Sequence, residues 1–429
     1  MGILDVPAYS RADSDARFAA AEQLSSFFVP VATRAAPPFQ ATIGLSDGVI
    51  LGGTAKVAHV AVRSFSTPRL AYSNFYPAAG VIEADTPNSI TVRAAFEPVS
   101  GTVIPITFGG RRSIVIEPGA TVYADPLGYD LAKGTQFYTR TYVEVTSGQK
   151  FPRCQYLVTA GTEGHNYGNP IGADLTSTGA ATVNGQNLGT RVFGPSMISG
   201  HPIDGGKPVI GLAGDSIVRG TGDNDLGLFE RALGNNYSFM NVAFPSENMS
   251  GWIGSNGLTR YRRQSLLAQA GPSHIVTNYT VNSLGQSTFL TDALAIWKSL
   301  RRMAPKVHAT TLTPQTSTTD AWATVANQTP SRAAGDETRR IEFNTWLRDG
   351  APISAGAPVA SGTTNATRIG ATGHPLVGYF EVADAVESAR NSGRWKASLT
   401  SDGIHPNTAG AIAASVAIDP LVFGPISLA

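Results

Sequence analysis

The chain has 429 residues, of which 42% are hydrophobic and 15% charged, and its net charge is +1. The hydrophobic share is large enough to build folded cores and argues against wholesale disorder, while the length predicts two domains. Because the charge is balanced, no basic surface for nucleic acid is expected. The 46 glycines and 27 prolines favour strands and loops over a helical bundle.

The N-terminal segment, residues 1–37, predicts a helix followed by an extended arm. The helix is expected over 12–28, with Asp13 or Ser14 as its N-cap, and a proline-interrupted stretch follows it. The segment lacks the basic start and apolar run of a signal peptide. No stretch of the sequence reaches the ~18 apolar residues of a membrane span. We therefore expect a soluble protein without a membrane partner. Its compartment and oligomeric state stay open, with extracellular and virion-associated locations among the alternatives.

Residues 38–204 predict an all-β domain. Apolar and polar residues alternate along four short runs, at 56–64, 89–97, 111–125 and 135–145. A period of two places successive side chains on opposite faces of a strand. Short strands separated by Gly and Pro, with no helical stretch between them, are typical of a β-sandwich or jelly roll. Residues 160–203, rich in Gly, Thr and Asn, predict loops.

Residues 205–429 predict an α/β domain. Five apolar runs predict strands, at 207–214, 237–244, 274–281, 306–314 and 377–386. Helical patterns lie between and after them, at 266–271, 291–304, 336–350 and 407–417. Strands that alternate with helices build a parallel sheet covered on both faces, so we expect an α/β/α sandwich.

The first of these strands runs into Gly214, Asp215 and Ser216. In an open parallel sheet, ligands bind beyond the carboxyl ends of the strands. At a strand-to-helix turn, backbone N–H groups can face a developing oxyanion. Ser216 is therefore a candidate nucleophile, although serine is also a common helix N-cap.

A second motif, Asp402 to His405, precedes the last predicted helix. A serine nucleophile needs a base to take its proton, and the base needs an acid to orient it. The spacing lets Asp402 fold back on Nδ1 of His405 and leaves Nε2 for Ser216. The alternative is an ordinary helix cap beside a surface histidine.

Asn282 follows the predicted strand 274–281. A side-chain amide at this place can donate to an oxyanion, a contribution of roughly 3–4 kcal/mol in known hydrolases. An asparagine that satisfies a turn is the alternative. Ser216, Asn282 and the Asp402–His405 pair all lie at the ends of predicted strands or before the last helix, and together they predict one catalytic site.

These residues resemble the SGNH (GDSL-like) hydrolase family, whose blocks are GDS, a glycine block, GxND and DxxH. The resemblance spans roughly residues 207–416. It implies a flavodoxin-like α/β/α fold and the hydrolysis of esters, often acetyl esters, without a cofactor. By resemblance, Ser216 is the nucleophile and its N–H the first oxyanion donor, Asn282 is the third donor, and Asp402 and His405 are the acid and base.

The chain departs from the family pattern at two blocks. Ser246 aligns with the glycine of the second block, where a backbone N–H can donate whatever the side chain. The GxND block has Thr280 for its glycine and Ser283 for its aspartate. Whatever the missing aspartate supports in the family must here be supported otherwise.

Three further residues near the motifs have weaker assignments. Asp215 is expected to make structural bonds around the turn. Arg219 and Trp252 are candidates for substrate contacts, with a surface arginine and a core aromatic as the alternatives.

The seven histidines show no metal-binding spacing, so no metal is expected.

The sequence thus predicts a carboxylic-ester hydrolase that forms an acyl-enzyme and acts on acylated carbohydrate as an O-deacetylase of polysaccharide. The carbohydrate is inferred from residues 38–204, which resemble accessory sandwich domains of carbohydrate esterases. One alternative is a lipid or aryl esterase of the same chemistry. Another is a virion-associated protein that binds or deacetylates glycan, since residues 1–37 look like the attachment segments of phage tail proteins.

Overall fold

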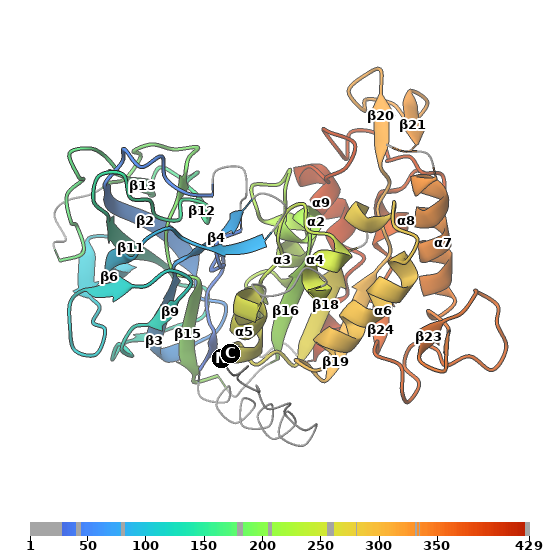
Figure 1. Cartoon of the computed structure of the whole chain (residues 1–429), viewed down its shortest axis with the longest axis horizontal. Helices are drawn as coiled ribbons and strands as arrows, with labels where there is room; N and C mark the ends of the chain where they lie inside the picture. The colour runs from blue at the N-terminus through green and yellow to red at the C-terminus, as the bar shows by residue number, and fades with distance from the viewer. Residues whose placement is uncertain are drawn as a thin grey trace, which may run out of the picture.

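The computed structural model describes residues 28–39, 44–78, 82–177, 183–204, 208–254, 261–279, 281–330, 333 and 335–424. The helix predicted over 12–28 lies outside these residues, apart from Phe28. Figure 1 shows two halves side by side, a strand-rich half in blue to green and an α/β half in yellow-green to red.

The strand-rich half is built on two antiparallel sheets. The first has the order β1-β15-β3-β10, with β9 also paired to β3, and comprises β1 (Val29–Pro30), β3 (Phe65–Ser73), β9 (Thr121–Tyr123), β10 (Asp130–Leu131) and β15 (Met197–Pro202). The second has the order β13-β2-β11-β6-β7, with β8 paired to β6, and comprises β2 (Gly52–Val60), β6 (Ile90–Val99), β7 (Thr102–Pro105), β8 (Ile114–Ile116), β11 (Gln136–Glu144) and β13 (Gly164–His165). Two short pairs accompany them, β4 (Phe75–Ala78) with β5 (Ile82–Asp85) and β12 (Tyr156–Leu157) with β14 (Arg191–Val192).

Side chains from the two sheets meet in a common core. The rings of Phe65 on β3 and Phe137 on β11 lie 6.4 Å apart, and the hydroxyls of Tyr72 and Thr141 are 3.1 Å apart. The alternation over 135–145 matches β11, whose inward side chains reach this core. The strands predicted from period-two patterns are therefore present, while the jelly-roll topology and the boundaries at 38 and 204 stay predictions.

Two segments of this half differ from expectation. The extended arm contributes β1 to the first sheet, because Val29 and Pro30 pair with Gly200 and Ser199. The region 160–203, predicted as loops, contains β15, which pairs with β3 along most of its length. Its sequence, MISGHP, has no clear alternation, and it is a strand because it pairs with β3 on one side and β1 on the other.

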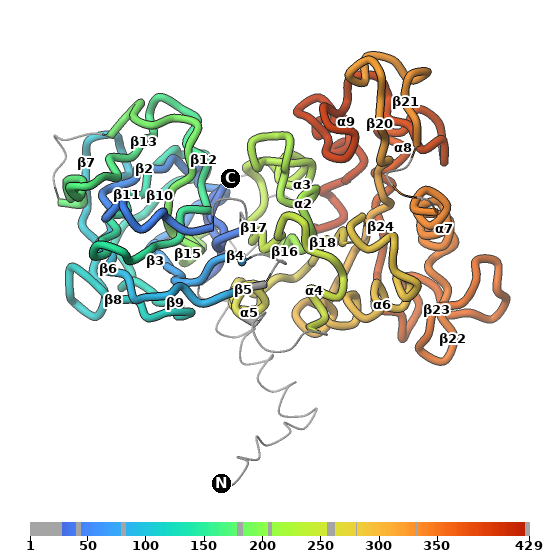
Figure 2. Tube along the Cα trace, turned by 45° about the horizontal axis from the view of Figure 1, so that its top comes forward, coloured from blue at the N-terminus to red at the C-terminus, as the bar shows by residue number. Residues whose placement is uncertain are grey.

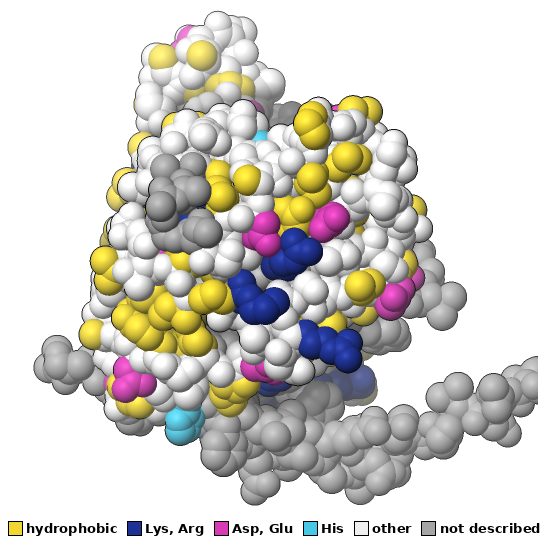
Figure 3. Space-filling view, turned by 90° about the vertical axis from the view of Figure 1, so that its left-hand side faces the viewer, with side chains coloured by type: hydrophobic (Ala, Val, Ile, Leu, Met, Phe, Trp, Pro, Cys, Tyr) yellow, Lys and Arg dark blue, Asp and Glu magenta, His cyan; other side chains and the backbone are white. Residues whose placement is uncertain are grey.

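The end of the strand-rich half that faces away from the α/β half has a mixed surface. Figure 3 shows hydrophobic patches there, with basic and acidic side chains interspersed among uncharged ones. Within this half, Arg93 pairs with Glu144 and Asp174 at 3.7 and 3.2 Å. Opposite charges that lie close together give this face no strong field of one sign.

The α/β half contains a sheet of five parallel strands in the order β17-β16-β18-β19-β24. Its members are β16 (Val209–Gly214), β17 (Ser238–Asn241), β18 (His274–Asn278), β19 (Lys306–Thr310) and β24 (Gly378–Phe380). Numbered along the chain, this is the order 2-1-3-4-5 of flavodoxin-like sheets. The predicted α/β class is thus present.

Helices cover both faces of this sheet (Figure 1). Alternate side chains of β16 divide between two cores, with Val209 and Ala213 in one and Ile210 and Leu212 in the other. The first core includes residues of α4 (Met249–Ile253), α5 (Tyr261–Gln269), α6 (Phe289–Leu300) and α7 (Asp336–Arg348). The second includes residues of α2 (Ser216–Arg219), α3 (Gly227–Leu233), α8 (Val382–Val386) and α9 (Thr408–Ser415).

The last predicted strand, 377–386, is wrong in its second part. Only Gly378–Phe380 forms β24, and Val382–Val386 forms the short helix α8. Glu381 ends the strand because its side chain accepts a hydrogen bond from the backbone N–H of Asp384, which caps the helix.

Candidate active site

Ser216 lies where β16 gives way to α2, at the carboxyl edge of the parallel sheet. Asp215 is the N-cap of α2, and its Oδ1 accepts a hydrogen bond of 2.9 Å from the N–H of Ile217. As the first helical residue, Ser216 has an N–H without a partner in the helix. Its residue exposure is 7%, so most of the residue is packed into the turn.

Ser216, His405 and Asp402 form one hydrogen-bonded chain. Nε2 of His405 lies 2.8 Å from Oγ of Ser216, and Nδ1 lies 2.6 Å from Oδ2 of Asp402. An ionised carboxylate can only accept, so the proton between Asp402 and His405 belongs to Nδ1. In the neutral imidazole, Nε2 is then the acceptor for the Ser216 hydroxyl proton.

Asp402 is held as a carboxylate by its own loop. Burial alone would raise its pKa, but hydrogen bonds from the side chain and N–H of His405 and from the N–H of Ile404 outweigh burial and lower the pKa well below its usual value. Both backbone bonds, at 2.8 Å, go to Oδ1, which leaves Oδ2 for the imidazole. One carboxylate therefore both folds the loop and orients the ring.

The loop between Asp402 and His405 is anchored to a hairpin of β20 (Thr316–Thr318) and β21 (Gln328–Pro330). The carbonyl of Gly403 accepts hydrogen bonds from the N–H of Thr316 at 2.9 Å and from Nε1 of Trp395 at 3.1 Å. On the other side of the loop, the carbonyl of His405 accepts from the hydroxyl of Thr400 at 2.8 Å. These contacts fix the backbone on both sides of the pair.

A second anchor joins the region after α2 to the start of α9. Thr408, the first residue of α9, donates from its hydroxyl to Asp223 at 2.8 Å. Asp223 also receives a bidentate pair from Arg231 at 2.6 and 2.7 Å. Because Thr408 follows His405 closely, this contact holds the imidazole near the nucleophile despite a separation of 189 residues in the chain.

Asp215 is buried beside the nucleophile. Burial raises the pKa of its carboxyl to about 7, although the N–H of Ile217 favours the charged form. Its Oδ2 has no hydrogen-bond partner among the described residues. Nδ1–H of His405 donates to Asp402 instead. Asp215 therefore stabilises the turn through its bond from Ile217, as the sequence predicts.

The two other predicted oxyanion donors lie on neighbouring loops. Ser246, after β17, has φ of +68°, the left-handed conformation that favours glycine. Asn282 lies in the 3₁₀ turn Val281–Ser283 after β18, and its Nδ2 donates to the carbonyl of Glu247 at 3.0 Å. Both side chains are exposed, and an amide has a second N–H to offer.

The loops that carry these donors are tied to the nucleophile turn by backbone bonds. The N–H of Phe244 donates to the carbonyl of Gly214 at 2.9 Å, and the N–H of Asp215 donates to the carbonyl of Asn278 at 3.2 Å. The hydroxyl of Ser283 accepts from the N–H of Met249 at 2.8 Å. Ser283 thus ties the Asn282 turn to α4. Thr280 lies outside the described residues.

Arg219 and Trp252 do not lie where a substrate could contact them. Arg219 is 3% exposed, with its guanidinium 4.0 Å from the ring centre of Phe39 and facing Glu230 at 3.9 Å. Trp252 is 2% exposed and packs against Tyr279, ring centre to ring centre 5.4 Å. Their predicted substrate contacts are wrong, because both side chains point into the interior rather than to the surface.

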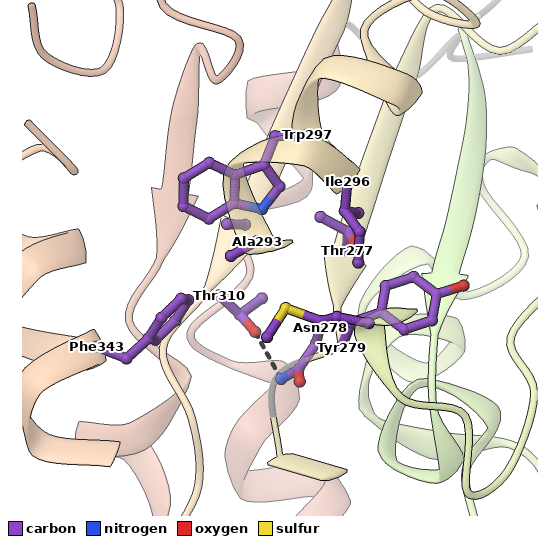
Figure 4. Close-up of a pocket in the computed structure, with 10 residues that line it drawn as sticks. Thr277, Asn278, Tyr279, Ala293, Ile296, Trp297, Thr310 and Phe343 are labelled. Atoms are coloured by element: carbon purple, nitrogen blue, oxygen red, sulfur yellow. Dashed lines mark hydrogen bonds between the residues drawn. The ribbon is translucent and has the colours of Figure 1, made fainter. Parts of the chain in front are cut away.

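A small cavity behind the nucleophile strand is not a substrate site. It lies between β18, β19 and α6, with the amide of Asn278 bonded to the hydroxyl of Thr310 at 2.8 Å on its wall (Figure 4). Its volume is about 10 Å³, room for about one water molecule. Trp297 and Phe343 complete an apolar lining that belongs to the core.

The described part of the chain holds neither a metal-binding cluster nor a membrane-spanning helix. Those residues contain no group of three or more His, Cys, Asp or Glu side chains placed to hold a metal ion. Among the helices of the same residues, none combines the length and apolar character needed to cross a membrane.

A buried ion cluster beside the site escaped the sequence analysis. Arg263 on α5 pairs with Glu247 at 2.7 Å and with Glu83 of β5 at 2.6 Å. Glu83 and Arg263 are 180 residues apart in the chain and belong to different halves. The sequence gives one hint, a charged residue with apolar neighbours at these positions. Many surface residues have the same pattern, so it does not point to a buried cluster.

The chain matches no protein-family model and no curated protein. Among solved structures it is similar to a family two carbohydrate esterase from Clostridium thermocellum, at 12% identity over 92% of this chain and 98% of that one, with a TM-score of 0.33. A salicylyl-acyltransferase from a tetracycline biosynthetic pathway has 10% identity over 93% and 98%, with a TM-score of 0.32. An acetylxylan esterase from Geobacillus stearothermophilus has 10% identity over 50% and 93%, with a TM-score of 0.31.

Proposed function

We propose that the chain is a serine esterase that hydrolyses carboxylic esters through an acyl-enzyme, with Ser216 as nucleophile, His405 as base and Asp402 as the orienting acid. The observation that carries the proposal is the chain of two hydrogen bonds, 2.8 Å and 2.6 Å, that joins the three side chains. Such a chain is the arrangement that activates a serine hydroxyl in unrelated hydrolases.

In the first half of the reaction, Oγ of Ser216 attacks the ester carbonyl carbon while Nε2 of His405 takes the hydroxyl proton. The carboxylate of Asp402 stabilises the resulting imidazolium and keeps its ring in place. Nε2–H then gives the proton to the leaving alkoxide as the C–O bond breaks. An alcohol departs and the acyl group stays on Ser216.

In the second half, a water molecule attacks the acyl carbon and His405 takes one of its protons. The proton passes to Oγ of Ser216 as the acyl–oxygen bond breaks, which restores the starting state and releases the carboxylic acid. Negative charge on the tetrahedral oxygen in both halves needs donors. We assign them to the N–H of Ser216, the N–H of Ser246 and the second N–H of Nδ2 of Asn282.

We further propose that the substrate is an acetylated polysaccharide. The side chain of Asp402 is 50% exposed, and those of Ser246 and Asn282 are exposed, so the site is open to solvent. An open site supports a substrate in which a small acyl group projects from a bulky polymer, whereas a long acyl chain would call for an enclosed apolar channel.

The first test is hydrolysis of p-nitrophenyl esters with acyl chains of two to eight carbons. We expect the acetyl ester to be hydrolysed fastest and Ser216→Ala to retain less than about 1% of kcat, because the nucleophile is lost. A phosphonate inhibitor should label Ser216, as mapped by peptide mass spectrometry. An adduct on another serine would contradict the assignment, and preference for the eight-carbon ester would favour a lipid esterase.

The second test is acetate release from a panel of acetylated polysaccharides, compared with their chemically deacetylated forms. The proposal expects release from at least one polymer by the wild type and none by Ser216→Ala. Hydrolysis of p-nitrophenyl acetate without release from any polymer would limit the function to small esters.

A further inference from the structure

A buried salt-bridge network connects the strand-rich half to the loop that carries Ser246. The carboxylate of Glu83 accepts from Nε of Arg263 at 2.6 Å, and the two guanidinium Nη atoms of Arg263 donate to both oxygens of Glu247 at 2.7 and 3.2 Å. All three side chains are fully or almost fully buried. Figure 2 shows β5, which carries Glu83, beside α5, which carries Arg263, at the junction of the halves.

The network reaches Glu247, which contacts both predicted oxyanion donors, Ser246 and Asn282. Glu247 directly follows Ser246, and its carbonyl holds Nδ2 of Asn282 at 3.0 Å. Arg263 also donates to the carbonyl of Val242 at 2.7 Å, and its guanidinium lies 4.4 Å from the ring centre of Phe244. Arg263 therefore binds the loop 242–247 at both ends, at Val242 and at Glu247.

This loop needs an external support. Ser246 adopts φ of +68°, a left-handed conformation that is strained for a non-glycine residue. Burial raises the pKa of Glu247, and the charge of Arg263 opposes that rise. A carboxylate paired in two places with a planar guanidinium is held in both position and orientation.

We infer that Glu83 and Arg263 are positioning residues that hold the Ser246–Glu247 turn and, through it, the amide of Asn282, so that the strand-rich half completes the oxyanion site. The inference rests on the proposed function for the meaning of these donors. On this view, the first half of the chain is required for turnover even though Ser216, His405 and Asp402 all lie in the second half.

The experiment compares substitutions of Glu83 in the full chain. Glu83→Ala removes the contact, Glu83→Asp keeps the charge but shortens the reach, and Glu83→Gln keeps an oxygen that can accept from Nε of Arg263. We expect kcat on p-nitrophenyl acetate to fall about tenfold in Glu83→Ala with KM within about twofold, and Glu83→Gln to recover most of the loss. If Glu83→Ala does not fold, the same kcat and KM measurements on Glu83→Asp test the inference.

The matched control is Asp204→Ala. Asp204 pairs with Arg63 at 2.7 Å within the strand-rich half, and Arg63 also donates to the hydroxyl of Ser238 at 3.3 Å, at the amino end of β17. This buried pair therefore supports a second contact between the two halves, at the end of β17 away from the loop 242–247. We expect Asp204→Ala to lower the melting temperature without lowering kcat. Equal losses of kcat in Asp204→Ala and Glu83→Ala would overturn the inference, since the network would then be general interface stability.

A second readout does not depend on catalysis. The side-chain amide signal of Asn282 in a ¹⁵N–¹H spectrum, assigned by its loss in Asn282→Ala, should shift or broaden in Glu83→Ala and Glu83→Asp and stay in place in Asp204→Ala. An unchanged signal in both Glu83 variants would overturn the positioning role. A wild-type chain without esterase activity would instead refute the proposed function, while the spectrum still decides the inference.

Discussion

Gly403 lies directly against the backbone of Thr316. A Cβ atom added to Gly403 would come within 1.9 Å of the carbonyl oxygen of Thr316, and φ of Gly403 is +80°. Because Gly403 stands between Asp402 and His405, this contact sets where both side chains project. The β20–β21 hairpin therefore acts on the site without contributing a catalytic group.

Gly403→Ala should displace the loop and lower kcat about 100-fold, because a shift of about 1 Å at the reacting atoms costs that much. Gly373→Ala is the matched control, since Gly373 has φ of +90° and no neighbour within 4 Å of an added Cβ. Both variants should lose stability from the positive φ, but only Gly403→Ala should lose kcat. Equal activities at equal melting temperatures would contradict this role of Gly403.

Asp402→Asn should lower kcat by about 10² to 10⁴, measured on p-nitrophenyl acetate. The amide oxygen can keep the bonds from Ile404 and His405 backbone N–H groups, but its NH₂ then faces Nδ1. The imidazole would carry its proton on Nε2, facing Ser216, and could not accept another. If Asp402→Asn is nearly silent while Asp215→Asn abolishes turnover at an unchanged melting temperature, the acid has been assigned to the wrong residue.

Asp215→Asn should change how stability depends on pH. The folded-state pKa of Asp215 is raised to about 7 from 3.8, so the folded state binds the proton more tightly than the unfolded state. The free energy of unfolding of the wild type therefore loses this contribution as pH rises between those values. The melting temperature of Asp215→Asn relative to wild type should rise from pH 4.5 to pH 7.5, as followed by calorimetry. A difference that is constant across this range would refute the raised pKa.

Asn282→Ala should lower kcat by about 10² to 10³ with little change in KM, because one donor to the tetrahedral oxygen is lost. Ser246→Gly provides the contrast. At φ of +68° glycine is unstrained and its N–H remains, so kcat should stay within about threefold of wild type. A large loss of kcat in Ser246→Gly would mean that the Ser246 side chain, rather than its backbone, takes part.

Much of the α/β half follows from local patterns in the sequence. Runs such as 209–214 are continuously apolar because a parallel strand is buried on both faces, and this pattern, bounded by glycine and alternating with helical segments, predicts the strands of a parallel sheet. Short motifs also marked Ser216, Asp402 and His405, because the chemistry requires these residue types at strand ends and helix starts. The sequence predicts a strand where α8 forms. The helix begins at a cap made by one side chain, Glu381, and a single contact of this kind leaves no pattern in an apolar run.

Only the tertiary structure decided which residues meet and which are hidden. Arginine and tryptophan are residue types that often contact substrates. In this structure Phe39 packs against Arg219 and Tyr279 packs against Trp252, and both side chains are buried. The pairing of Glu83 with Arg263 spans 180 residues, and no local pattern encodes a partner at that distance. The sequence by itself determined the residue types for the chemistry and the alternation of strands and helices, which are short-range properties. The packing of the two halves decided the support of the site, because it depends on contacts between segments that are remote in the chain.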